Sequence, residues 1–381
     1  MTDWQAWADA QAAQVRAAGQ WRAPRAFDAS DAGGTAGTVF ADGAPRAVVS
    51  FASNDYLGLT RHPAVVAAAH DAIDQWGTGA GAARLIVGSR PVHDDLEHAL
   101  AEWKRTERAV LFSTGFAANL GVLSTFAGPD VLVLSDALNH ASLIDGRRLA
   151  GAPLAVYDHC DVAHAERLLL ASDAPRKLVV TESVFSMDGD VAPIDDLAAV
   201  CARHGALLVV DEAHAVLGPD PDFADAAVGG PDVLRVGTLS KTLGALGGFV
   251  AGPARFTDLL VNQARSYIFT TASTPADTAA ALAAVGVVRS DEGAALRARL
   301  RANIDRVRPG HPSPVIPYVC GSEDATLGAA AALLDDGILV TAIRPPTVPP
   351  GTSRLRVAIS AAHTPDQLDH LAAALQRLFP A

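Results

Sequence analysis

Short apolar runs alternate with helical patterns along the chain between about residues 92 and 250. Seven runs have the length and composition of strands, over 109–112, 131–134, 153–157, 177–182, 206–211, 232–238 and 247–251. Helical spacing of apolar residues lies over 92–105, 115–125, 140–150, 161–171, 193–204 and 223–228. Because strands that alternate with helices form mostly parallel sheets covered on both faces, the pattern predicts an α/β domain.

The two ends of the chain have a different pattern. Residues 1–20 predict one amphipathic helix, 28–45 a loop, and 46–52 a strand. An Ala-rich helix is predicted over 275–306, followed by strands near 338–343 and 354–359 and a last helix over 365–378. We therefore predict an N-terminal helix and arm (1–45), a large domain (46–275) and a smaller α+β C-terminal domain (276–381).

Composition narrows the classes of protein. Half of the 381 residues are hydrophobic and 19% are charged, which excludes a disordered chain. The formal net charge of −12 argues against a general nucleic-acid binder. No apolar stretch is long enough to cross a bilayer, and the three cysteines form no CxxC pair. We expect a cytoplasmic protein with no membrane span, no disulfide framework and no cysteine zinc site.

Polar residues end three of the predicted strands. Glu182 ends one strand, and Asp211 ends the next and precedes His214. Lys241 follows the third strand, beside Thr238 and Ser240. Carboxyl ends of parallel strands meet at one edge of a sheet, so Asp211, His214 and Lys241 are expected to converge.

The chain has only three lysines, so few side chains can supply a primary amine. Lys104 falls on the polar face of a predicted helix and Lys177 precedes a strand, so both are expected to face solvent. Lys241 combines a strand end, hydroxyl neighbours and the nearby glycines 244, 247 and 248. It is therefore the best candidate for a chemical role.

A lysine, an aspartate and a histidine at neighbouring strand ends suit pyridoxal phosphate. The lysine forms an imine with the cofactor aldehyde, and the aspartate keeps the pyridine nitrogen protonated. The cofactor phosphate needs backbone N–H groups at a helix start, which the segment 113–119 offers, and hydroxyls such as Thr238 and Ser240.

Two other motifs resemble nucleotide-binding signatures but lie in the wrong sequence context for that function. The segment 211–214 spells a helicase box, but no Walker A loop precedes it. The segment 77–82 matches a loose dinucleotide-binding pattern, but it follows a helix instead of a strand. We interpret it as a turn that approaches a ligand.

Seven segments together resemble the α-oxoamine synthases, which are fold-type I enzymes that use pyridoxal phosphate. The segments are 53–59, 113–119, 139–143, 181–189, 211–214, 238–241 and 344–356. The resemblance runs from Phe51 to about Leu368, and one departure is Ala215, where the family usually has glycine. It implies a large domain with a mostly parallel sheet plus a smaller α+β domain, and a homodimer with shared sites.

The resemblance also implies a role for each matching residue. Lys241 would carry the cofactor, Asp211 would bind the pyridine nitrogen, and His140 would stack on the ring. The other cofactor ligands would be His214, Ser186, Gly115, Phe116, Thr238 and Ser240, with Thr270 or Thr271 supplied by the partner subunit. The substrate-binding residues would be Asn54 and Arg356 for the amino-acid carboxylate, and Thr347 and Arg22 for the acyl group, with Arg16 and Arg25 as alternatives to Arg22.

The segment 344–349 points to the branch of this family that condenses L-alanine with a pimeloyl thioester. The acyl group would arrive on CoA or on an acyl carrier protein. Two alternatives stay open. A related synthase would use glycine with another acyl-CoA, and a scaffold protein of the same fold would bind no cofactor.

Overall fold

The computed structural model describes residues 2–41, 43–217 and 232–380. Contacts divide the chain into two units. The first comprises residues 1–53, 187–189 and 300–381, and the second comprises 54–186 and 190–299. None of the helices within the described residues has both the length and the apolar character needed to cross a bilayer.

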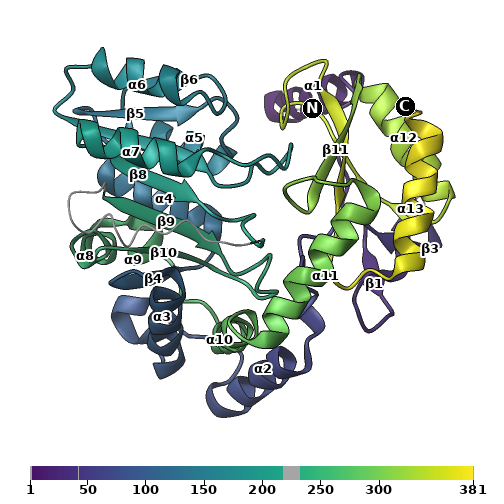
Figure 1. Ribbon diagram of the computed structural model, residues 1–381, viewed down its shortest axis with the longest axis horizontal. Coiled ribbons are helices and arrows are strands. Elements are labelled where there is room, and N and C mark those ends of the chain that lie inside the picture. Colours follow the sequence, from purple (N-terminus) through teal and green to yellow (C-terminus); the bar gives the residue numbers. More distant parts are fainter. Residues whose placement is uncertain (1, 42, 218–231, 381) are drawn as a thin grey trace. The chain divides into compact units, whose positions relative to one another are not determined.

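The second unit is built on a seven-stranded sheet, whose strands run from blue through teal to green in Figure 1. Its order is β4 (Arg108–Phe112), β10 (Gly248–Gly252), β9 (Val233–Thr238), β8 (Leu207–Asp211), β7 (Arg176–Glu182), β5 (Val131–Asp136) and β6 (Leu154–Tyr157). The five strands from β9 to β6 are parallel, whereas β10 is antiparallel to both of its neighbours.

Helices cover both faces of this sheet because successive strand side chains point to opposite sides. On one face Val209 packs with α4 (Gly115–Phe126), α5 (Ala141–Ala150), α8 (Ala254–Gln263) and α9 (Arg265–Ile268). On the other face Leu208 and Val210 pack with α6 (Val162–Leu170) and α7 (Ile194–His204). Figure 1 shows α6 and α7 in front of the strands and α4 and α5 behind them.

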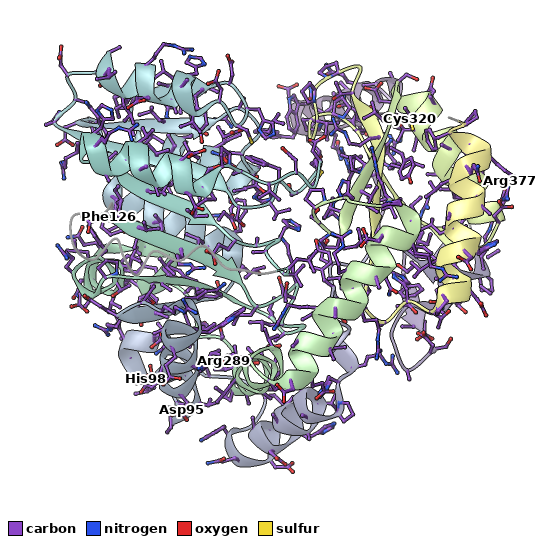
Figure 2. All side chains as sticks on the ribbon, viewed as in Figure 1. Asp95, His98, Phe126, Arg289, Cys320 and Arg377 are labelled. Atoms are coloured by element: carbon purple, nitrogen blue, oxygen red, sulfur yellow. The ribbon has the colours of Figure 1, made fainter. Side chains whose placement is uncertain are left out.

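Three further helices complete the second unit: α2 (Pro63–Trp76), α3 (Pro91–Lys104) and α10 (Pro275–Val288). Each begins with proline, which lacks the N–H that the first turn of a helix leaves unbonded. α10 does not continue into the next helix as the sequence predicted for 275–306. It ends at Val288, with Arg289 (labelled in Figure 2) as its C-cap, and α11 (Asp291–Val307) begins two residues after Arg289.

The first unit contains two small sheets. In one, β1 (Phe27–Ala29), β2 (Ala36–Ala41), β3 (Ala44–Ser50) and β12 (Ile338–Leu339) follow one another. In the other, β14 (Ser353–Ala358) lies between β11 (Val315–Gly321) and β13 (Thr341–Ile343). The helices are α1 (Asp3–Ala17), α12 (Glu323–Asp335) and α13 (Pro365–Leu378), together with the end of α11.

Each of the seven strands expected in the large domain is present within two residues. The prediction of a loop over 28–45 is wrong in part, because β2 and β3 pair there as an antiparallel hairpin. The helix expected over 223–228 lies outside the described residues. The two units meet after residues 53 and 299 of the chain, whereas we expected domain boundaries after residues 45 and 275.

Candidate active site

The carboxyl ends of β7, β8 and β9 bring three expected residues to one edge of the large sheet. Asp211 ends β8 and pairs in register with Glu182 of β7 and Val236 of β9. His214 lies three residues after Asp211, and its Nε2 is 2.8 Å from the Nζ of Lys241. Asp211 and His214 are buried, whereas Lys241 is only partly buried. An amine next to an imidazole and a carboxylate can exchange protons with a bound substrate.

A chain of hydrogen bonds extends from Lys241 through His214. The Nδ1 of His214 is 2.6 Å from the hydroxyl of Tyr56, which donates to the Oδ1 of Asn54 at 3.1 Å. When the hydroxyl donates to Asn54, it accepts the Nδ1 proton of His214. The Nε2 of His214 is then the acceptor that faces Lys241. Tyr56 thus sets the tautomer of the imidazole.

A Tyr56→Phe variant is expected to lose about 1–3 kcal/mol of unfolding free energy, because the buried Nδ1 of His214 loses its partner. Urea unfolding of the cofactor-free protein measures this loss. Tyr157→Phe is a matched control in the same unit, since the hydroxyl of Tyr157 contacts Thr181 and, at 3.5 Å, the carbonyl of Val180 instead of His214. Equal losses for both variants would contradict the role assigned to Tyr56.

The carboxylate of Asp211 is held by a second network. Its Oδ2 accepts from the Nδ2 of Asn119 at 2.7 Å, and its Oδ1 accepts from the backbone of Ala213 at 2.9 Å. Asn119 also donates to the hydroxyl of Ser142, which lies 2.8 Å from the Nδ1 of His140. His140 and Asp211 are therefore oriented by shared neighbours.

His140 is the N-cap of α5, and its Nδ1 accepts from the backbone of Ser142. Part of its ring is exposed to solvent. The surrounding protein nevertheless lowers the pKa of His140 by desolvation, which outweighs the Asp211 carboxylate, and the Lys241 ammonium lowers it further. A ring that stays neutral and open on one side can cover a flat ligand.

Glu182 is a buried acid that the sequence analysis gave no role. Its carboxyl accepts from the backbone N–H groups of Ser186 and His140, so it ties two of the expected cofactor ligands together. Burial raises the pKa of Glu182 well above its usual value, and the charge of Asp211 adds to this rise. Lys241 opposes the shift.

The start of α4 offers an anion-binding site. Thr114 caps the helix, and Gly115 and Phe116 occupy its first turn, where backbone N–H groups lack helical partners. Thr238 lies against Gly115, since a Cβ on that glycine would be 3.2 Å from the Cβ of Thr238. The hydroxyls of Thr238 and Ser240 are 2.8 Å apart. This set of donors suits a phosphate.

His159 anchors the segment that carries Ser186. Its Nδ1 is 2.8 Å from Asp136, and its Nε2 is 2.5 Å from Asp190, whose carbonyl accepts from the backbone of Phe185. Burial lowers the pKa of His159, but the hydrogen bonds to Asp136 and Asp190 outweigh burial, and the net effect is a raised pKa.

This bridge predicts a pH-dependent contribution to stability. A raised pKa in the folded protein stabilises it fully below the unfolded value of about 6.5, and the contribution is lost as pH rises through the folded pKa. A His159→Gln variant should therefore be less stable than wild type by about 1–3 kcal/mol at pH 5.5. The difference should shrink by pH 9.5. Urea unfolding at both pH values tests this, and a difference independent of pH would contradict it.

The expected substrate residues are divided between the units. Asn54 belongs to the second unit, whereas Arg356 is buried in β14 of the first unit. Arg22 and Thr347 line one groove of about 1090 Å³ within the first unit, and Arg25 and Arg344 also line it. Arg22 donates to the carbonyls of Arg344 and Pro345. Thr270 and Thr271 line a separate cavity of about 10 Å³ with Ser113.

Two predictions on the lysines need correction. Lys104 does not face solvent: its side chain is 3% exposed, and its Nζ is 2.9 Å from Glu212. Lys177 is partly buried and donates to the carbonyl of Leu169. Both errors arose because helical periodicity and sequence neighbours do not show which partner lies across the fold.

The methyl group of Ala215 causes no left-handed strain, because among the described non-glycine residues only Arg105 and Cys160 have positive φ.

Comparisons with known proteins agree with this geometry. Residues 46–375 match the aminotransferase class I and II family. The chain is 51% identical to the 8-amino-7-oxononanoate synthase of Anaeromyxobacter dehalogenans over 347 residues, which cover 88% of this chain and 87% of that protein.

Solved structures have the same fold. Serine palmitoyltransferase from Sphingomonas wittichii is 30% identical with a TM-score of 0.88, and the match covers 99% of this chain and 97% of that chain. 8-Amino-7-oxononanoate synthase from Francisella tularensis is 26% identical with a TM-score of 0.71, over 87% of this chain and 96% of that one. The chain thus belongs to the aminotransferase class I and II family and, within it, to the 8-amino-7-oxononanoate synthases.

Proposed function

We propose that this chain uses pyridoxal phosphate to condense L-alanine with a pimeloyl thioester. The products are 8-amino-7-oxononanoate, CO₂ and the free thiol, and the reaction is a step of biotin biosynthesis. The observation that carries the proposal is the arrangement of Lys241, His214 and Asp211 at neighbouring strand ends, in a chain about half identical to synthases of this name.

The residues at this site fit pyridoxal phosphate. Asp211 is a buried carboxylate whose oxygens each keep a further lone pair for a pyridine N–H. The first turn of α4 and the hydroxyls of Thr238 and Ser240 match the phosphate. His214 and Ser186 would bind the ring oxygen, and His140 would cover the ring face. Lys241 is the amine that would meet the aldehyde.

When bound, the cofactor supplies an aldehyde that condenses with primary amines and a ring that withdraws electrons from the α-carbon of the substrate. The Nζ of Lys241 would remove the α-proton of alanine, and His214 is placed to share that proton through its Nε2. Asp211 would hold the proton on the ring nitrogen. Asn54 and Arg356 would bind the carboxylate of alanine, since a guanidinium forms paired hydrogen bonds with a carboxylate.

The groove of the first unit suits the acyl substrate. Apolar residues such as Leu327 and Leu334 line it together with the arginines. Burial lowers the pKa of Arg344, and repulsion from Arg22 and Arg25 lowers it further against the opposing charge of Glu323. An apolar groove with a surplus of positive charge fits a chain that ends in a carboxylate, such as a pimeloyl group.

An Arg22→Ala variant is expected to raise the KM for pimeloyl-CoA roughly 10- to 100-fold with little change in kcat. The reason is the loss of a charged contact, worth roughly 1.5–3 kcal/mol, that binds the acyl group equally well throughout the reaction. Arg16→Ala serves as the control, because Arg16 stacks on Trp21 and does not line the groove. A raised KM in Arg25→Ala with an unchanged KM in Arg22→Ala would assign the contact to Arg25.

We also propose a cytoplasmic homodimer. Leu85, Ile86 and Val87 expose half or more of their surface, and so does Phe269, which follows α9. The segments join where the backbone of Ala272 donates to the carbonyl of Ala82. Such an apolar patch on neighbouring segments is typical of a protein interface.

The three cysteines are free thiols, in keeping with a reducing compartment.

Product analysis tests the proposed reaction. Purified protein is supplied with pyridoxal phosphate and pimeloyl-CoA, and with alanine, glycine or serine as the amino acid. We expect 8-amino-7-oxononanoate from alanine, with one CO₂ and one free thiol for each molecule of product. A strong preference for glycine would assign the chain to another α-oxoamine synthase, and protein that takes up no pyridoxal phosphate would favour a scaffold. Repeating the assay with the thioester of acyl carrier protein identifies the acyl carrier.

A further inference from the structure

A buried ion cluster lies directly behind the Asp211–His214 turn. It consists of Lys104 at the end of α3, Glu212 after β8 and Arg235 in β9. The Nζ of Lys104 is 2.9 Å from one oxygen of Glu212, and the Nε of Arg235 is 2.6 Å from the other. All three side chains are 4% exposed or less.

The cluster is closed by a third contact. The guanidinium of Arg235 donates to the backbone carbonyl of Lys104 at 3.0 Å, at the C-terminal end of α3, where a positive charge is favourable. The ammonium of Lys104 also lies 4.1 Å from the centre of the Trp103 ring. Two cations therefore hold one carboxylate between a helix and two strands.

The same carboxylate belongs to the turn that carries the two cofactor ligands. Glu212 directly follows Asp211 and precedes His214 by two residues. Its backbone N–H donates to Val236 at 2.7 Å, and its carbonyl accepts from Ala215 at 3.0 Å. The ion pairs of the Glu212 side chain anchor its Cα in addition to these backbone bonds, and so they restrain the short stretch of backbone between Asp211 and His214.

We propose that Lys104, Glu212 and Arg235 are positioning residues that fix the Asp211–His214 turn for pyridoxal phosphate. This rests on the proposed function, because it takes Asp211 and His214 as cofactor ligands. The directional hydrogen bonds of the cluster carry the effect. An apolar cluster of the same volume would pack at least as stably. Because apolar contacts are not directional, however, it would not fix the orientation of the side chain at position 212.

A triple variant, Lys104→Met with Glu212→Met and Arg235→Met, distinguishes a positioning role from a merely structural one. Full replacement leaves no buried charge without a partner, so the cofactor-free variant is expected to melt within a few degrees of wild type. Titration with pyridoxal phosphate should show at least 10-fold weaker binding than wild type. The visible circular dichroism of the bound cofactor should change as well.

A variant that melts like wild type, binds pyridoxal phosphate with wild-type affinity and gives the wild-type spectrum would overturn the proposal. Wild-type protein that does not bind pyridoxal phosphate would instead overturn the proposed function.

A milder variant covers the case in which the triple variant does not fold. Arg235→Lys keeps the charge but loses the planar fork that reaches both Glu212 and the carbonyl of Lys104. We expect a severalfold weaker affinity for pyridoxal phosphate and an altered visible spectrum. Arg176→Lys is the matched control, since Arg176 lies at the exposed start of β7 in the same sheet. Equal affinity and spectra in both variants would contradict the proposal.

Discussion

A Lys241→Ala variant is expected to fold like the wild type and to lose turnover by about 10⁴-fold or more. The side chain is only partly buried, so its removal leaves little empty volume in the core. In the proposed reaction, however, the variant lacks both the amine that would bind the cofactor and the base that would move the α-proton. Turnover with alanine and pimeloyl-CoA, measured beside a thermal melt, gives both quantities.

Lys177→Ala is the matched control for this variant. Lys177 lies in the same sheet and donates to the carbonyl of Leu169, away from the carboxyl ends of the strands. Its removal should leave kcat within about twofold of wild type, as is usual for a residue outside the reacting groups. Full activity of Lys241→Ala would contradict the mechanism, and so would a loss in Lys177→Ala as large as that in Lys241→Ala.

An Asp211→Asn variant should weaken pyridoxal phosphate binding roughly 10- to 100-fold, the range expected when a hydrogen bond to a charged group is lost. Turnover should fall by roughly 10²–10³-fold, because an amide cannot hold the positive charge on the ring nitrogen. The size of the side chain is unchanged, and one of its atoms can still accept from Ala213. Reconstitution of the cofactor-free protein and steady-state kinetics measure the two effects.

Asp173→Asn is the control for this loss of charge. Asp173 is exposed in the loop after α6, so the substitution should change neither cofactor affinity nor kcat. An Asp211→Asn variant that binds pyridoxal phosphate as tightly as wild type would show that Asp211 does not contact the ring nitrogen.

The sequence predicted the parts of the site that follow from local pattern. An apolar strand that ends in Asp211 or Thr238 is visible in a few residues, and parallel strands place such ends at one edge. The same reasoning predicted an anion site at the start of α4, because a helix start is also a local feature.

Contacts between distant segments could not be predicted in this way. The hydroxyl of Tyr56 reaches His214 across 158 positions, and Asn119 reaches Asp211 across 92. Both residues lie in segments that carried the family resemblance, but nothing in their spacing shows their partners. Lys104 is the clearest case, since its helix position predicted exposure and only the fold shows that Glu212 lies opposite it.

The break between α10 and α11 had a similar cause. Helical periodicity continues through Arg289 and Ser290, so an Ala-rich stretch predicted one helix. The structure ends α10 there, and the backbone of Ser290 bonds to the carbonyl of Val287. Propensity favours a helix on both sides of the break but does not fix its ends.

Reductive trapping of the cofactor shows which of the three lysines carries the chemistry. Holoenzyme is treated with borohydride, digested, and mapped by mass spectrometry for the pyridoxyl group on Lys104, Lys177 and Lys241. We expect the pyridoxyl group on the Lys241 peptide and no modification of the other two lysines. A pyridoxyl group on Lys104 or Lys177, with Lys241 unmodified, would contradict it.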